Sequence, residues 1–124
     1  MVINKTTRIN SIFIAVHFLF LFSGCAYFNT FYNAERYFRE AEKERLQKAG
    51  ETLSASAKTA YQNVIEKSIH VIKKYPQSKY VYPAMLLIGK SRFYLEEYTQ
   101  AESMFRQLKQ EGGKDYGSES QFWL

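Results

Sequence analysis

The residues of this 124-residue chain that could carry chemistry are few and scattered. It holds one cysteine, Cys25, and two histidines, His17 and His70. A single thiol cannot close an internal disulfide, and one thiol with two distant histidines lacks the spacing of a metal site. The sequence therefore predicts no metal and no cofactor, and Cys25 needs a different explanation.

Acidic residues concentrate between positions 35 and 44, where basic residues alternate with them. The acidic members are Glu35, Glu40, Glu42 and Glu44, and the basic ones are Arg36, Arg39, Lys43 and Arg45. On a helix this spacing favours a solvated, salt-bridged face over a pair of catalytic carboxylates. Ser91 has no candidate base, and no glycine-rich phosphate loop is present. The sequence therefore predicts that the protein is not an enzyme.

The residues before Cys25 follow the order of a secretory signal. Lys5 and Arg8 form a basic start, and residues 9–22 are a mostly apolar run that ends in small residues. About 14 apolar residues fall short of the roughly 20 that a bilayer span needs. An uncleaved membrane anchor is the alternative, since the run extended through Phe28 just reaches that length.

The small pair Ser23 and Gly24 directly before Cys25 resembles a bacterial lipobox, with Phe22 where that motif usually has leucine. In lipoproteins the cysteine sulfur takes a diacylglyceryl group and the leader is cut just before it. Because each buried methylene contributes about 0.8 kcal/mol, several acyl chains on one residue make a stable anchor. The resemblance implies that residues 1–24 are a lipoprotein signal peptide and that Cys25 is the lipid attachment site.

Ala26 follows the cysteine, and in bacterial lipoproteins a residue other than aspartate there implies the outer membrane, with the protein facing the periplasm. Loss of the leader removes Lys5 and Arg8, which lowers the formal charge from +5 to +3 because no acidic residue precedes Cys25. The remaining basic residues are interleaved with glutamate, and no long basic block is present. Nucleic acid is therefore not expected as a partner, and with no catalytic site predicted, no small-molecule substrate is expected either.

Apolar residues at spacings of three and four predict helices throughout the chain after Cys25. The expected helices run from about residue 30 to 49, from 54 to 74, from 82 to 95, and from 99 to Gly112-Gly113. Thr99 and Glu102 match the T-x-x-E capping box at the start of the last of these. With no alternating strand pattern, the sequence predicts an all-α fold of antiparallel helix pairs.

Gly89, Tyr98, Ala101 and Phe105 have the relative spacing of the small and aromatic positions in a tetratricopeptide repeat. Small residues let two paired helices approach closely, and the aromatic ring fills the space beside them. The stretch "KKYPQSKYVYPAMLLIGKSRFYLEEYTQAESMF" resembles the repeats of the BamD-like outer-membrane assembly lipoproteins, and the likeness covers roughly residues 61–108. The resemblance implies an α-solenoid of tetratricopeptide-type helical hairpins.

The stretch "SESQFWL" after Gly112-Gly113 is expected to open another helix, in which residues 121–124 occupy the same repeat positions as residues 85–88. Solenoids need about three repeats to close their stack, and this chain supplies fewer. We therefore expect residues 25–124 to be one repeat domain that is truncated at its C-terminus, as an N-terminal fragment of a longer protein.

Aromatic residues crowd the segment nearest Cys25. They are Tyr27, Phe28, Phe31, Tyr32, Tyr37 and Phe38. One interpretation is that they fill the core against the second helix. The other places Tyr27, Phe28 or Tyr32 against lipid headgroups or a partner, since such rings suit both surroundings.

Likeness to these lipoproteins implies a lipid-anchored periplasmic scaffold that binds protein partners, among them the β-barrel-inserting outer-membrane subunit. An envelope adaptor for cell-wall synthesis or secretion is the alternative. In tetratricopeptide proteins the first helix of each hairpin lines a groove for peptides. By that resemblance Lys90 and Arg92 would face the groove, where they would suit an acidic segment or a C-terminal carboxylate.

Overall fold

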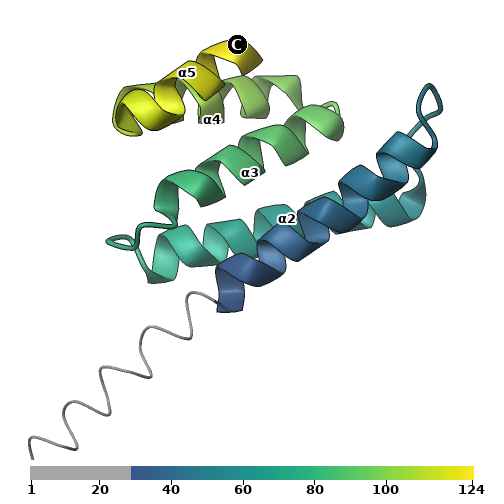
Figure 1. Ribbon diagram of the computed structural model, residues 1–124, viewed down its shortest axis with the longest axis horizontal. Coiled ribbons are helices and arrows are strands. Elements are labelled where there is room, and N and C mark those ends of the chain that lie inside the picture. The colour runs from purple at the N-terminus through teal and green to yellow at the C-terminus, as the bar shows by residue number, and fades with distance from the viewer. Residues whose placement is uncertain (1–28) are drawn as a thin grey trace, which may run out of the picture.

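The computed structural model describes residues 29–124, so the predicted leader and Cys25 lie outside the described residues (Figure 1). Over this range the chain is helical apart from short turns and contains no strand, which confirms the predicted all-α class. Residues 29–47 form the first helix. It is followed by α2 (Ala55–Lys74), α3 (Val81–Tyr94), α4 (Tyr98–Glu111) and α5 (Gly113–Trp123).

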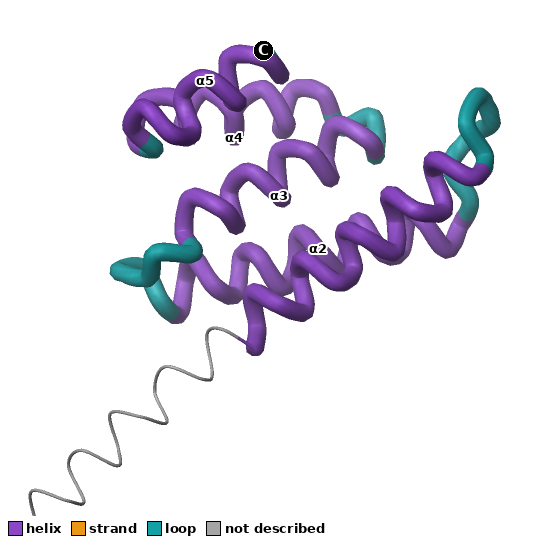
Figure 2. The backbone as a smooth tube through the Cα atoms, in the orientation of Figure 1, coloured by secondary structure: helices purple, strands orange, loops and turns teal. Residues whose placement is uncertain are grey.

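Successive helices run antiparallel and pack side by side, joined by short turns (Figure 2). The 29–47 helix lies along α2, where the rings of Phe38 and Tyr61 meet edge to face at 6.0 Å. From there α2 packs on α3, α3 on α4, and α4 on α5, and α3 also contacts α5. The helices therefore form a stack in which α3 touches three of its neighbours.

The sequence predicted α2 closely. Ser54 caps its start, because the Ser54 Oγ accepts a hydrogen bond from the Ala57 backbone N–H at 3.1 Å. The helix ends at Lys74 because Tyr75 precedes Pro76, and the residue before a proline is pushed out of helical geometry.

The predicted capping box of the fourth helix is wrong. In the structure α4 begins at Tyr98, and its N-cap residue Glu97 makes no side-chain capping bond. The cause lies in how α3 ends: Glu96 adopts a left-handed conformation with φ 64°, and the Glu97 N–H donates to the Arg92 carbonyl at 2.9 Å. This tight Schellman-type turn moves the N-cap two residues earlier than predicted, from Thr99 to Glu97, which leaves Thr99 inside the first turn.

The glycine pair at 112–113 does end α4, as predicted, and the expected further helix follows. Its start was placed too late, however, because α5 already begins at Gly113. Gly113 itself has φ 65°, a left-handed conformation that costs glycine little.

Close approach of α3 and α4 at Gly89 is confirmed. A Cβ atom added to Gly89 would lie only 2.5 Å from Cε1 of Phe105. Phe105 and Ala101 are both buried, so the ring of Phe105 occupies the space that the missing side chain leaves.

One aromatic ring from each helix joins a continuous chain of ring contacts, which we call the aromatic spine. Its members are Phe38, Tyr61, Tyr94, Trp123 and Phe105. Tyr61 stacks on Tyr94 at 5.4 Å, Tyr94 meets Trp123 at 5.9 Å, and Trp123 stacks on Phe105 at 5.6 Å. Each such pair adds roughly 0.5–1.5 kcal/mol beyond the area that it buries. The spine thereby fixes α3 between α2 and α5.

Candidate partner-binding surface

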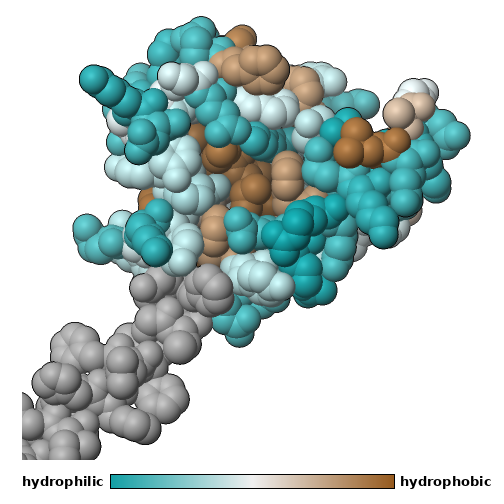
Figure 3. Space-filling model, in the orientation of Figure 1, coloured by the Kyte–Doolittle hydropathy of each residue, from teal (hydrophilic) through white to brown (hydrophobic). Residues whose placement is uncertain are grey.

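Between the 29–47 helix and α5, α3 presents one face to its two flanking helices. Leu86, Lys90 and Phe93 share this face because they are three or four residues apart. Figure 3 shows hydrophobic residues gathered in a hollow on the side of the molecule that carries α3, with hydrophilic residues around them. We call the surface formed by this face of α3 and the side chains linked to it by contacts the inner face. Its residues are Glu42, Arg45, Leu86, Lys90, Phe93, Tyr94, Glu119 and Trp123.

Lys90 lies on the inner face and joins α3 to α5. Its Nζ is 2.5 Å from Oε1 of Glu119 and 5.5 Å from the centre of the Trp123 ring. The Lys90 side chain is only 20% exposed, whereas that of Glu119 is 42% exposed. Glu119 is therefore the more accessible member of the ion pair. A carboxylate of another protein would compete with Glu119 for the ion pair with Lys90.

Arg92 does not join Lys90. Residues two apart on a helix point about 200° from one another, so the two side chains leave α3 on nearly opposite sides. The Arg92 Nη1 lies 2.5 Å from Oε2 of Glu97, in the turn before α4. Contact of Lys90 or of Arg92 with a partner stays a prediction. Because the two side chains leave α3 on nearly opposite sides, they do not line the same groove.

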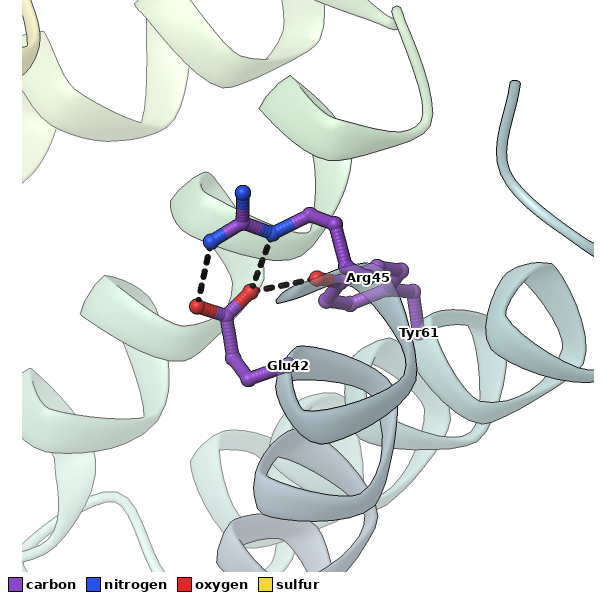
Figure 4. Close-up of polar contacts among 3 residues, drawn as sticks. All are labelled: Glu42, Arg45 and Tyr61. Carbon is purple, nitrogen blue, oxygen red and sulfur yellow. Dashed lines mark hydrogen bonds and ion pairs between the residues drawn. The ribbon is translucent and has the colours of Figure 1, made fainter. Parts of the chain in front are cut away.

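A polar cluster borders the inner face on the side of the 29–47 helix (Figure 4). Arg45 donates two hydrogen bonds to the Glu42 carboxylate, from Nε to Oε1 at 3.0 Å and from Nη2 to Oε2 at 2.8 Å. The Tyr61 hydroxyl donates to the same Oε1 atom. The guanidinium carbon of Arg45 also lies 4.2 Å from the centre of the Tyr94 ring. The cluster thus ties together the 29–47 helix, α2 and α3.

Ionisation of these groups follows from that geometry. Burial acts to raise the pKa of the Glu42 carboxyl, but the hydrogen bonds from Arg45 and Tyr61 outweigh it and lower the pKa below its ordinary value of 4.5. Burial, followed by the hydrogen bond to Glu42, raises the pKa of Tyr61. Glu42 therefore stays ionised and Tyr61 stays a neutral donor near neutral pH.

The sequence predicted a solvated salt-bridged face for this helix, and both Arg36–Glu40 and Arg45–Glu42 form ion pairs, but only the first of these pairs is well exposed to solvent. Arg36 and Glu40 form an exposed ion pair one helical turn apart, at 3.2 Å. Glu42 instead points toward the fully buried Tyr61. The available signal was Tyr61 itself, because a tyrosine on an apolar helix face must find a partner for its hydroxyl.

Glu42→Gln is expected to lower the free energy of unfolding by about 1–3 kcal/mol at neutral pH, because it leaves Arg45 without its charge-assisted hydrogen bonds. The folded-state pKa of Glu42 is lowered, so its stabilising effect is present above 4.5 and is lost as the pH falls through the folded pKa. The difference between wild type and variant should therefore shrink in acid. Urea titrations at several pH values measure it.

Glu40→Gln is the matched control for that experiment, since it removes a carboxylate of the same helix whose ion pair is exposed. It should change stability by less than about 1 kcal/mol. Equal losses for the two variants would contradict the role assigned to Glu42.

Within residues 29–124, no three histidine, cysteine, aspartate or glutamate residues come together in a group that would hold a metal ion. No helix of this described part is both long enough and apolar enough to cross a membrane. No protein-family model, curated protein or solved structure matches the chain.

The inner face combines apolar, aromatic and charged groups, and such a mixture suits contact with a protein segment.

Proposed function

We propose that this protein is a lipid-anchored scaffold of the bacterial outer membrane, which faces the periplasm and binds protein partners through tetratricopeptide-type repeats. The observation that carries the proposal is the order of the chain: a lipobox-like Ser23-Gly24-Cys25 ends an apolar leader, and a helical stack begins within a few residues of it. An acylated cysteine would hold this stack at the membrane surface.

Packing at the motif positions supports the repeat assignment. Gly89 and Phe105, which match the small and aromatic positions of the repeat, meet at the closest approach of α3 and α4. Contacts of α3 with both α4 and α5 also suit a solenoid, in which each hairpin packs on the next.

For the partner, we propose a segment that carries carboxylates and apolar side chains and lies along the inner face. The half-buried Leu86 and the part-exposed Phe93 would receive its apolar groups. Lys90 would receive a carboxylate in exchange for Glu119. In the assembly of outer-membrane β-barrel proteins, which we propose as the process served, the barrel-inserting subunit would provide this segment.

Cys25→Ala tests the anchor. We expect complete loss of incorporated radiolabelled palmitate and release of the protein from the membrane fraction, because no other thiol can accept the diacylglyceryl group. Ser23→Ala is the control and should keep the label, since alanine is also small. The intact mass of the native protein is a second and direct test. A mass that shows Met1 still attached and Cys25 unmodified would refute the lipoprotein assignment.

A photo-crosslinking amino acid at Phe93 separates the two proposed processes. Crosslinks to the barrel-inserting subunit, together with loss of barrel proteins on depletion, would support the assembly role. Crosslinks to cell-wall or secretion proteins, with barrel proteins unchanged, would support the adaptor alternative. The same crosslinker at the exposed Gln107 of α4 controls for random capture.

A further inference from the structure

A basic surface lies where α2 ends and the turn to α3 begins. Lys73 and Lys74 are exposed in the last turn of α2, and Lys79 is exposed in the turn that follows. No acidic residue stands between Glu66 and Glu96 in the sequence. We call the three lysines the basic end.

The positive charge of the basic end is not matched by any carboxylate side chain of the chain itself. Among residues 29–124, none of its three lysines forms an ion pair, while the nearby Lys67 is already paired with Glu66 at 2.8 Å. Residues 1–28 contain no aspartate or glutamate. The helix dipole accounts for cations in the last turn of α2, but not for Lys79 beyond it.

The basic end lies beside the point where the described chain begins. Phe31, in the first turn of the 29–47 helix, stacks on Tyr80 at 4.8 Å and packs with Val71. Cys25 is four residues before Asn29, so the length of the chain keeps their Cα atoms within about 14 Å of one another. A lipid on Cys25 would therefore place a membrane surface close to the basic end.

From this placement we propose that the basic end binds the phosphate headgroups of anionic lipids in the membrane to which Cys25 is anchored. The inference rests on the proposed lipid anchor and adds a second, electrostatic contact to it. A lysine near an anionic surface strengthens association about five-fold, and the effect fades over about 8 Å at physiological salt.

Tyrosine rings accompany two of these lysines, since the Nζ atoms of Lys74 and Lys79 lie 5.6 Å and 5.2 Å from the rings of Tyr75 and Tyr80. Such rings suit the headgroup region of a bilayer. An acidic protein would match the charge equally well. The lipid surface is favoured because the anchor keeps it beside the lysines at all times, whereas a protein must first be recruited.

Lysine footprinting of the native lipoprotein tests the proposal. The purified protein is reconstituted into phosphatidylethanolamine vesicles with or without phosphatidylglycerol, treated with an uncharged amine-acylating reagent, and analysed by mass spectrometry. We expect acylation of Lys73, Lys74 and Lys79 to slow about five-fold when phosphatidylglycerol is present. High salt should restore the faster rate, because it screens charge.

Exposed lysines away from the basic end are controls within the same molecule. They are Lys48 and Lys58, which lie at the opposite end of the helix pair formed by residues 29–47 and α2 (Figure 1), and their acylation rates should not depend on the lipid. Equal rates at the basic end in both vesicle types, or equal slowing of all lysines, would overturn the proposal. Protection seen in native membranes but in neither vesicle would also overturn it, in favour of an acidic protein.

This readout is local to residues 73–79, so it does not depend on how the chain is held at the membrane. If Cys25 proves unmodified and the leader itself is the anchor, the proposed lipoprotein fails while the footprint still reports on the basic end. Conversely, an acylated Cys25 with unprotected lysines would leave the anchor intact and refute only the headgroup contact.

Discussion

Phe105→Ala is expected to lower the free energy of unfolding by about 3–5 kcal/mol, the largest loss predicted for a single change in this molecule. Phe105 is fully buried, fills the space beside Gly89, and stacks on Trp123 at 5.6 Å. Removing the ring leaves a cavity where three helices meet. Domains of this size are stable by about 5–15 kcal/mol, so this single change would remove a large fraction of the free energy of unfolding.

Urea titration followed by far-UV circular dichroism measures the loss. Phe122→Ala is the matched control, because it deletes the same ring from a residue that is 82% exposed. We expect that variant to stay within about 0.5 kcal/mol of wild type. Similar losses at the two positions would show that Phe105 does not have the buried, central place described for it.

Gly89→Ala is expected to destabilise the protein by about 1–3 kcal/mol, although alanine normally favours a helix over glycine by about 1 kcal/mol. The added Cβ would lie 2.5 and 2.8 Å from atoms of the Phe105 ring, and that ring is held in place by Trp123. The sign of the change is therefore the test. A stabilised Gly89→Ala variant would mean that α3 and α4 do not approach as closely as described.

Two further variants isolate this steric conflict. Gly117→Ala makes the same change within α5, where the added Cβ meets nothing within 4 Å, so we expect a gain of about 0.5–1 kcal/mol. Combining Gly89→Ala with Phe105→Leu replaces the flat ring by a smaller side chain. The double variant should lose less than the sum of the two single losses, as measured by a double-mutant cycle.

Helices were predictable from the sequence because their signals are local. Apolar spacing, the Ser54 cap, Pro76 and the glycine pair at 112–113 all act within a few residues, and the structure follows them. The start of α4 was missed because the left-handed conformation at Glu96 replaces the glycine that usually marks such a turn. A turn of this kind depends on how two helices dock and leaves little trace in the residue types.

The candidate surface was less predictable, since its contacts join distant parts of the chain. Glu42 meets Tyr61 and Lys90 meets Glu119, pairs that are 19 and 29 residues apart. A pattern within one helix assigns Glu42 to a solvated face because it contains no information about the neighbouring helix. Arg92 was placed in the same groove as Lys90 by resemblance to tetratricopeptide proteins, whereas the helical twist separates the two side chains.

Trp123 gives the protein a built-in optical reporter. It is the single tryptophan of the chain, and its ring touches those of Phe93, Tyr94 and Phe105. Tyrosines excited nearby will transfer energy to it, and its emission will shift to longer wavelength when water reaches the indole. Fluorescence of the unlabelled protein can therefore follow whether α5 stays docked on α3 and α4.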